Sequence, residues 1–302
     1  MLFYTYNQIV KALPRLPLLE DAIALTFRRS LRSLTNGYPD FFNIVVVDVN
    51  NTLVNGSVEY ELLKDKIGED KAKSTFEYLD YLKENGKLTG NKWLLGAVQT
   101  MSEKGNGITN EDVHNTLQRL LNEGRINLEL VHIFQERKNN GAKVIVMTKG
   151  SCSYVAEWLA EKFGFDAGYG PKLDGAHNVH ELIGLNNKPI KGVKGVVIKT
   201  RLDKVKEFCK SDKGKGITFD MSKIAFVTDH IDSREMRGCV VVLYAPNEES
   251  VKSQHTAARF GTYDVKFGKD EHEKMHIFLS NPKMAGQLIK EKARKFAFAN
   301  TN

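Results

Sequence analysis

The sequence predicts an α/β protein built on a doubly wound parallel sheet, with a helical cap inserted after the first strand. Two observations support this fold class. Short runs of apolar and β-branched residues alternate with helix-length amphipathic segments, as in strand–helix–strand units joined by right-handed crossovers. The runs are apolar at nearly every position, and strands that are covered on both faces of a parallel sheet have this composition.

The expected elements begin with the run FFNIVVVDV at 41–49, which reads as a buried strand. Helical patterns fill 57–125, and the last of them has Thr109 or Asn110 as its N-cap and Gly124 as its stop. Strands and helices alternate after that point. The expected segments are the helix LELVHIFQERKNNG, a strand at 142–148, helices at 153–164 and 200–210, and strands at 223–228 and 239–245.

This order divides the 302-residue chain into four parts. Residues 1–40 form an N-terminal helical extension, whose apolar face docks on the core or, as a basic amphipathic helix, lies on a membrane. Residues 41–56 and 126–265 form the core of the protein. Residues 57–125 form the helical cap, and residues 266–302 form a C-terminal extension with a helix.

The composition is that of a globular protein, with 41% hydrophobic and 27% charged residues. Three widely separated cysteines make a disulfide framework unexpected and favour a cytoplasmic location. The longest apolar runs are of strand length, so no membrane span is expected. A net charge of +7 suits either anionic substrates or nucleic acid, but no nucleic-acid-binding signature accompanies it, so a nucleic-acid partner is unexpected. The oligomeric state stays open, with a homodimer as one option.

Polar residues follow three of the expected strands. Asp48 ends the first, Thr148 the second, and Asp229 follows the third. The carboxyl ends of parallel neighbours meet at one edge of the sheet, so these residues should converge. Two adjacent carboxylates are costly without a cation between them, and oxygen ligands favour Mg²⁺. With Thr148, Lys149 and Gly150 on the same side, the sequence predicts a phosphate site.

The segments that carry these residues resemble the motifs of the haloacid dehalogenase (HAD) superfamily. DVNNTLVNG resembles motif I, DxDx(T/V)(L/V), and VIVMTKG resembles motif II, an apolar strand that ends in Ser or Thr. Lys199 in VVIKTRLDKV fits the lysine of motif III, and IAFVTDHIDSREM resembles motif IV. The order of the motifs and the place of the cap are most similar to the phosphoserine-phosphatase-like branch, over roughly residues 43–260.

The resemblance implies a HAD-like Rossmannoid core and a Mg²⁺-dependent phosphatase, a hydrolase that acts on a small phosphorylated metabolite. Asp48 would be the nucleophile and would form an aspartyl-phosphate, while Thr148 and Lys199 would hold the phosphoryl oxygens. The implied metal ligands are Asp48, Asn50 through its carbonyl, Asp229 and, through a bound water, Asp232. The implied substrate-binding residues are Asn50, Lys149, Gly150 and Ser57.

Three departures from the pattern qualify this reading. Asn50 stands where family phosphatases carry an aspartate that serves as general acid and base, and an amide cannot exchange a proton near neutral pH. His230 is a candidate substitute. Ser57 stands where the branch has a cap glutamate that reads an amino group, and Lys149 adds a positive charge, so a more anionic substrate is expected. The alternative is a catalytically impaired HAD-fold binding or regulatory protein.

Two further patterns have a functional and a purely structural interpretation. HEKMH at 272–276 fits the zinc-protease pattern HExxH, but a charged exposed turn also fits it, and no third ligand follows at a telling spacing. Cys152 lies near an expected helix N-terminus, where a thiol can become reactive. A small buried residue is the alternative for Cys152.

Overall fold

The computed structural model describes residues 42–104, 107–174, 177–229, 239–244, 264–269 and 275–280. The expected N-terminal extension at 1–40 lies outside these residues. None of the helices in the described ranges combines the length and the apolar character that crossing a membrane requires.

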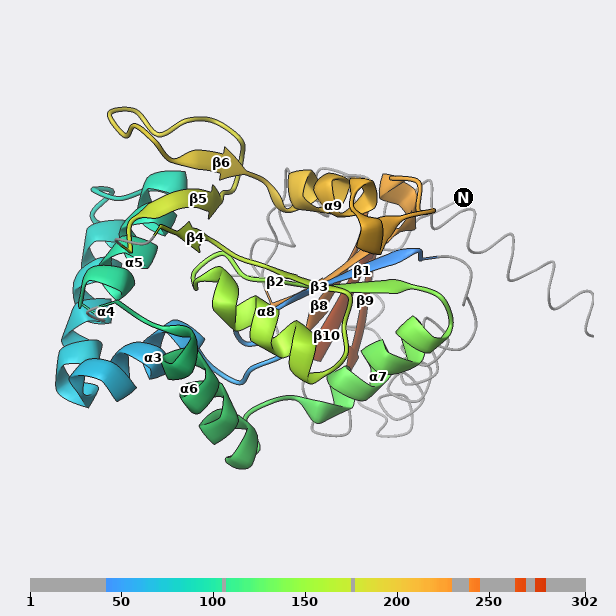
Figure 1. Cartoon of the computed structure of the whole chain (residues 1–302), viewed down its shortest axis with the longest axis horizontal. Helices are drawn as coiled ribbons and strands as arrows, with labels where there is room; N and C mark the ends of the chain where they lie inside the picture. The colour runs from blue at the N-terminus through green and yellow to red at the C-terminus, as the bar shows by residue number, and fades with distance from the viewer. Residues whose placement is uncertain are drawn as a thin grey trace, which may run out of the picture.

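The main sheet has the strand order β3-β2-β1-β7-β8-β10-β9. Strands β3 to β8 in this order pair in parallel, which confirms the predicted doubly wound α/β fold. Strands β10 and β9 continue the sheet in antiparallel pairing (Figure 1). The bounds are β1 Ile44–Asp48, β2 Lys143–Met147, β3 Ala167–Tyr169, β7 Ile224–Thr228, β8 Val240–Tyr244, β9 Asp264–Lys269 and β10 Met275–Ser280.

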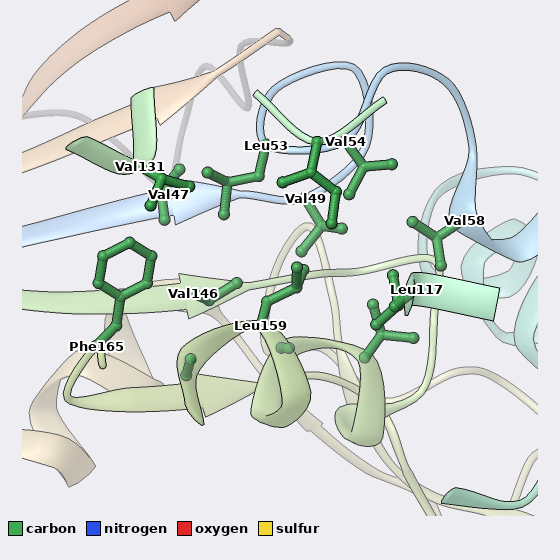
Figure 2. Close-up of a cluster of buried hydrophobic side chains, with 14 of the residues drawn as sticks. Val47, Val49, Leu53, Val54, Val58, Leu117, Val131, Val146, Leu159 and Phe165 are labelled. Atoms are coloured by element: carbon green, nitrogen blue, oxygen red, sulfur yellow. The ribbon is translucent and has the colours of Figure 1, made fainter. Parts of the chain in front are cut away.

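Helices cover both faces of the parallel strands. Side chains alternate along a strand, so Val45 and Val47 of β1 pack on helices α7 (Leu128–Asn139) and α8 (Ser153–Lys162). Figure 2 shows Val47, Val146, Leu159 and Phe165 in this cluster. Ile44 and Val46 point to the opposite face and pack against α9 (Arg201–Lys210), which the 3₁₀ turns Asp212–Gly214 and Met221–Lys223 follow. This two-sided burial explains why β1 is apolar at each of these positions.

The topology marks one point of the sheet as the place for a ligand. Counted in chain order, the parallel strands are arranged 3-2-1-4-5, so the direction of winding reverses between β1 and β7. In open α/β sheets, ligands bind outside the carboxyl ends of the strands at such a switch point. Asp48 is the last residue of β1, and Asp229 directly follows β7.

Four helices lie between β1 and α7, in the region where the sequence predicts the cap. They are α3 (Val58–Ile67), α4 (Glu69–Glu84), α5 (Gly90–Lys104) and α6 (Asn110–Asn122). Thr109 is the N-cap of α6, and its side chain and that of Asp112 form a capping box. Val58 of α3 and Leu117 of α6 belong to the same buried cluster as Val47, which ties these helices to the core (Figure 2).

A second insertion, to which the sequence analysis assigned no elements, follows β3. It contains β4 (Lys172–Leu173), β5 (Val179–Ile183) and β6 (Val197–Lys199), which form a small sheet of their own. Leu182 of β5 and Leu95 of α5 share a buried cluster, so the small sheet packs against the helical block. Figure 1 shows both at one end of the molecule. The cap is therefore built from two separate segments of the chain.

The C-terminal part differs from its prediction. The expected boundary at residue 265 falls inside β9, and β9 and β10 belong to the main sheet, so 266–269 and 275–280 contribute strands where an extension was expected. His276 of the HEKMH motif lies in β10. A zinc site of the HExxH type needs both histidines on one helix, and the second histidine here lies on a strand. Residues 281–302 lie outside the described ranges.

A buried carboxylate fastens the first and last helices of the α3–α6 block. Glu61 of α3 is 5% exposed, and it accepts hydrogen bonds from Arg119 (2.8 Å) and Arg125 (2.7 Å). Arg125 also donates to the carbonyl of Asn55, in the loop after β1. Burial acts to raise the pKa of Glu61, but the hydrogen bonds from Arg125 and Arg119 outweigh it and lower this pKa.

We predict that Glu61→Gln lowers the free energy of unfolding by roughly 1–3 kcal/mol at neutral pH, because two arginines lose a charged acceptor. A carboxyl group whose pKa is depressed by folding stabilises the protein above its unfolded pKa and loses this effect as the pH falls through the folded value. The difference from wild type should therefore shrink below about pH 4.3, the ordinary glutamate value. Urea denaturation across that range measures it. Glu77→Gln, in an exposed pair with Lys73, is the control; equal losses for both variants would contradict the prediction.

Candidate functional site

Asp48 lies at the centre of the site, and both of its carboxylate oxygens accept hydrogen bonds. Oδ1 accepts from the backbone N–H of Val49 at 2.9 Å. Oδ2 accepts from Nη2 of Arg201 at 2.6 Å and from the hydroxyl of Thr228 at 2.9 Å. The side chain of Arg201 is 4% exposed and that of Asp48 is 13% exposed. The carboxylate is thus held in one orientation by groups from β7 and from the start of α9.

Asp229 faces Asp48 across the switch point. Burial, and after it the negative charge of Asp48, raise the pKa of Asp229 to about 6. The hydrogen bond from the Asn51 side chain (3.2 Å) and the charge of Arg201 act in the opposite direction. Asn51 has a positive φ of 52°, a conformation that asparagine tolerates better than most residues. The turn after β1 therefore aims an amide at Asp229.

The two aspartates fit a hard divalent cation. The charge of Asp48 raises the cost of ionising Asp229, and a cation between the two side chains would remove that cost. The described residues contain no cluster of three or more His, Cys, Asp or Glu side chains suited to a metal. Two carboxylates, a backbone carbonyl such as that of Asn50, substrate oxygens and water would suffice for Mg²⁺, which usually keeps several waters. Asp232 and His230 lie outside the described residues.

A cavity of about 470 Å³ opens at this edge of the sheet. Its core wall carries the charged and polar groups, and its opposite wall comes from α4, α5 and the second insertion. The core wall consists of Asp48, Asn50, Thr148, Lys149, Gly150, Arg201 and Asp229. The opposite wall consists of Lys83, Leu88, Thr89, Gly90, Trp93, Leu94 and Leu185.

The core wall gathers positive charge and hydrogen-bond donors around Asp48. Thr148 is 1% exposed and Lys149 is 8% exposed, and both come from the turn that follows β2. Arg201 begins α9, so its guanidinium lies at a helix N-terminus, where an anion is favoured. Five of the residues that the sequence predicted for the site line this cavity beside Asp48. They are Asn50, Thr148, Lys149, Gly150 and Asp229.

The structure corrects the prediction for Lys199. Its ammonium group pairs with Glu181 at 3.0 Å and with Glu207, and Lys199 does not line the cavity. Arg201, two residues further along, occupies the place that Lys199 was expected to fill. The physical reason is local: Thr200 is the N-cap of α9, and its side chain and that of Asp203 form a capping box, so Arg201 is the first helical residue.

Ser57, predicted to bind substrate, caps a helix. Its hydroxyl accepts the N–H of Tyr60 as the N-cap of α3 and donates to Glu59 at 2.8 Å. Ser57 does not line the cavity. The hydroxyl of Ser57 is thereby joined to the buried carboxyl group of Glu59.

Asn50 is tied to the first turn of α3 through both ends of its side chain. Its Nδ2 donates to Glu59 at 2.6 Å, and its Oδ1 accepts the N–H of Val58 at 3.1 Å. The core loop and the cap are therefore joined by the residue that replaces the expected acid-base carboxyl group. The carboxyl group that Asn50 contacts belongs to Glu59.

Glu59 is unusual because it is buried and only partly satisfied. It is 5% exposed, and within the described ranges its Oε1 has no hydrogen-bond partner. Burial raises the pKa of Glu59, and the charge of Asp48 adds to this, while the hydrogen bonds from Ser57 and Asn50 lower it. A Cβ at Gly150 would lie 2.8 Å from that Oε1, so a larger residue at position 150 would displace the carboxyl group of Glu59.

Of the two interpretations of Cys152, the structure supports a small buried residue. It is 1% exposed, and burial raises the pKa of its thiol to about 11. A thiol with that pKa is almost entirely protonated at neutral pH and is a poor nucleophile.

Sequence reasoning missed three residues of the site: Arg201, Thr228 and Glu59. The capping box TRLD could have identified Arg201, because it fixes the start of α9. Thr228 is the last residue of a strand whose end was already assigned to the site. Glu59 had no sequence signal beyond its nearness to Ser57, because its role depends on the contact between α3 and the turn after β1.

Comparison with known proteins gives similarity at the level of structure alone. No family model matches the sequence, and no curated protein matches it significantly. A protein of unknown function from Bordetella pertussis matches with 13% identity and a TM-score of 0.49, over 73% of this chain and 96% of its own. A HAD family hydrolase from Salmonella enterica serovar Typhi has 14% identity and a TM-score of 0.43, over 75% and 71%. A phosphoserine phosphatase, solved as an analogue of its phospho-aspartyl intermediate, has 18% identity and a TM-score of 0.43, over 72% and 98%.

We predict that Arg201, and not Lys199, binds an oxyanion in this cavity. Arg201→Met should weaken the binding of inorganic phosphate about tenfold to a hundredfold, because it removes a buried, charge-assisted donor. Lys199→Met should leave the affinity within about twofold, since its ammonium group faces Glu181 and Glu207. Isothermal titration measures both affinities. The reverse order of effects would return the role to Lys199.

Proposed function

We propose that this chain is a Mg²⁺-dependent phosphohydrolase of the HAD type, which cleaves a small phosphomonoester through an aspartyl-phosphate on Asp48. The observation that carries the proposal is the arrangement around Asp48. A carboxylate at the switch point of a doubly wound sheet shares one cavity with a second carboxylate, Asp229, and with the cationic residues Lys149 and Arg201.

The chemistry follows from these groups. A carboxylate oxygen of Asp48 attacks phosphorus, a bond to Asp48 forms, and the ester P–O bond breaks with its electron pair on the leaving oxygen. That oxygen takes a proton from water. A second water then hydrolyses the aspartyl-phosphate, which releases inorganic phosphate and returns the Asp48 carboxylate.

Each residue of the core wall has a role in this scheme. Arg201 and Lys149 offset the negative charge of the phosphoryl group, and the hydroxyl of Thr148 donates to one of its oxygens. Asp48, Asp229 and the carbonyl of Asn50 would hold Mg²⁺, which when bound neutralises charge on the nucleophile and the phosphoryl group. Thr228 and Arg201 orient Asp48 through its Oδ2.

A second candidate function is supported by Asn50. With an amide at this position and its side chain fastened to Glu59 and Val58, the core loop has no carboxyl group ready to protonate a leaving group. A HAD-fold protein in this state would bind a phosphorylated ligand, or hold phosphate on Asp48, without efficient turnover. The two functions share the cavity and differ in the fate of the phosphoryl group.

We predict that Asp48→Asn abolishes Mg²⁺-dependent release of phosphate from p-nitrophenyl phosphate, because the amide is not a nucleophile. Asp80→Asn, an exposed aspartate on α4, is the matched control and should retain the wild-type rate. Malachite-green detection of phosphate measures the rates. A wild-type rate no faster than that of Asp48→Asn would exclude turnover.

The second candidate is then tested without turnover. Beryllium fluoride mimics a phosphoryl group on an aspartate, and with Mg²⁺ it should raise the melting temperature of the wild type but not that of Asp48→Asn. Stabilisation without phosphate release supports the binding protein. Neither stabilisation nor release would contradict both functions.

We predict that Asn50 limits the wild type to good leaving groups, since general acid assistance is worth roughly 10²–10⁴-fold. The double variant Asn50→Asp/Glu59→Gln exchanges the two side-chain types and keeps their hydrogen bond with the donor reversed. It should therefore hydrolyse glycerol phosphate about 10²–10⁴-fold faster than the wild type, with a much smaller gain on p-nitrophenyl phosphate.

Glu59→Gln alone is the control for the loss of the glutamate itself. Asn50→Asp alone is less informative, because it places two carboxyl groups at hydrogen-bond distance, where one must bind a proton. If the double variant gains no more on glycerol phosphate than on the aryl ester, the missing acid at position 50 is not what limits this site.

A further inference from the structure

The geometry points to a substrate whose alcohol part is a flat ring that carries a carboxylate or carbonyl group, bound against Trp93. This inference deepens the proposed function, on which it rests for the phosphoryl end of the ligand. It assigns a substrate-binding role to the wall of the cavity opposite Asp48, for which the sequence predicted no role.

The size of the cavity calls for an organic group beyond the phosphoryl group. Its volume of about 470 Å³ lies in the range of roughly 300–1,000 Å³ typical of pockets that enclose a drug-sized ligand. In the proposed function, the phosphoryl group is held by the core wall. The remaining space is bounded by Leu88, Leu94 and Leu185, which favour an apolar occupant over a hydrated one.

Trp93 gives this space its chemical preference. It lines the cavity, and its indole Nε1–H is buried with no acceptor among the residues that the structure describes. A buried donor without an acceptor is unfavourable, and a small rotation of the ring that brought a ligand oxygen within reach of Nε1 would relieve that cost. The ring itself favours a flat apolar partner, in stacked or edge-to-face contact.

The same wall favours negative charge on the ring substituent. The Lys83 ammonium group lies 5.0 Å from the centre of the Trp93 ring, and Lys83 also lines the cavity. Helix α5 starts at this wall with Gly90, so its positive N-terminal end adds to the charge of Lys83. An oxygen acceptor, and above all a carboxylate, suits both donors better than a hydroxyl or an ammonium group.

The wall is fixed in place before a ligand arrives. Asn91, 8% exposed, donates to the carbonyl of Asn186 at 2.9 Å and accepts the N–H of Leu185 at 2.8 Å. These bonds fasten the second insertion to α5, the helix that carries Trp93. Little conformational entropy is lost when a ring binds to such a preorganised surface.

The sequence provides a direct optical test, because it contains only two tryptophans. Trp158 lies on α8, where its Nε1 donates to His114 at 3.0 Å, and it does not line the cavity. Trp158→Phe therefore leaves Trp93 as the single indole. In this background, with Asp48→Asn added to prevent turnover, binding is followed through Trp93 fluorescence.

Three phosphate esters of alkyl alcohols separate the contributions: glycerol phosphate, benzyl phosphate and 4-carboxybenzyl phosphate. We expect 4-carboxybenzyl phosphate to change Trp93 fluorescence and to bind about tenfold or more tighter than glycerol phosphate, with benzyl phosphate between them. Trp93→Phe keeps an aromatic ring and removes the N–H, and Lys83→Met removes the charge. Each should reduce the preference for 4-carboxybenzyl over benzyl phosphate by about fivefold to tenfold, measured by titration calorimetry.

Lys87→Met is the matched control, because Lys87 lies over the Tyr81 ring and does not line the cavity. Equal affinities for the three esters, or an unchanged preference in both Trp93→Phe and Lys83→Met, would overturn the inference. Its failure is distinct from failure of the proposed function. If binding depends on the ring but no phosphate is released, the ring subsite is supported and the phosphohydrolase is not. If phosphate is released from all three esters at equal kcat/KM, the phosphohydrolase is supported and the ring subsite is not.

Discussion

The repulsion between Asp48 and Asp229 is the constraint around which this protein is organised. The fold brings the ends of β1 and β7 together at the switch point, so the two carboxyl groups cannot avoid one another. Arg201 and Thr228 bind Asp48 and keep it oriented, while burial and, after it, the negative charge of Asp48 raise the pKa of Asp229 to about 6. Two carboxyl groups held close together destabilise the folded protein. Such a site is suited to binding a cation or to a reaction that offsets the excess negative charge.

The contact between Asn50 and Glu59 shows how the cap and the site depend on each other. The residue two positions after Asp48 bonds to the first turn of α3, so the loop that carries Asp48 and the cap are one hydrogen-bonded unit. The carboxyl group missing from the loop is present in the cap, but burial disfavours its ionised form and its Oε2 is bound to Asn50. Exchanging the side chains of Asn50 and Glu59 therefore tests whether the position of the carboxyl group, and not only its presence, limits the reaction.

The sequence predicted the parts of the fold that depend on local pattern. The strand ends at Asp48, Thr148 and Asp229 follow from apolar runs and polar terminations, and the structure brings all three to one cavity. The second insertion escaped prediction because its strands are short, β4 having two residues, and owe their stability to packing against α5. Lys199 was predicted to bind the phosphoryl group because of its residue type. The start of α9, however, makes Arg201 the first helical residue, and Arg201 lines the cavity. Trp93 belongs to the site through tertiary contacts that no local pattern reports.

The two unusual features of the cavity favour the same kind of substrate. Without an acid at position 50, the leaving oxygen departs with its negative charge, which is easier for a phenolic oxygen than for an alkyl alkoxide; tyrosine, a phenol, ionises near pH 10. The wall that contains Trp93, Lys83 and the leucines favours a flat ring with an oxygen acceptor. An ester whose bridging oxygen is attached directly to such a ring would satisfy both demands, because the ring that binds at Trp93 is also the group that stabilises the departing charge. For such an ester Asn50 would be compatible with turnover, and its cost would fall on esters whose bridging oxygen is attached to an alkyl carbon.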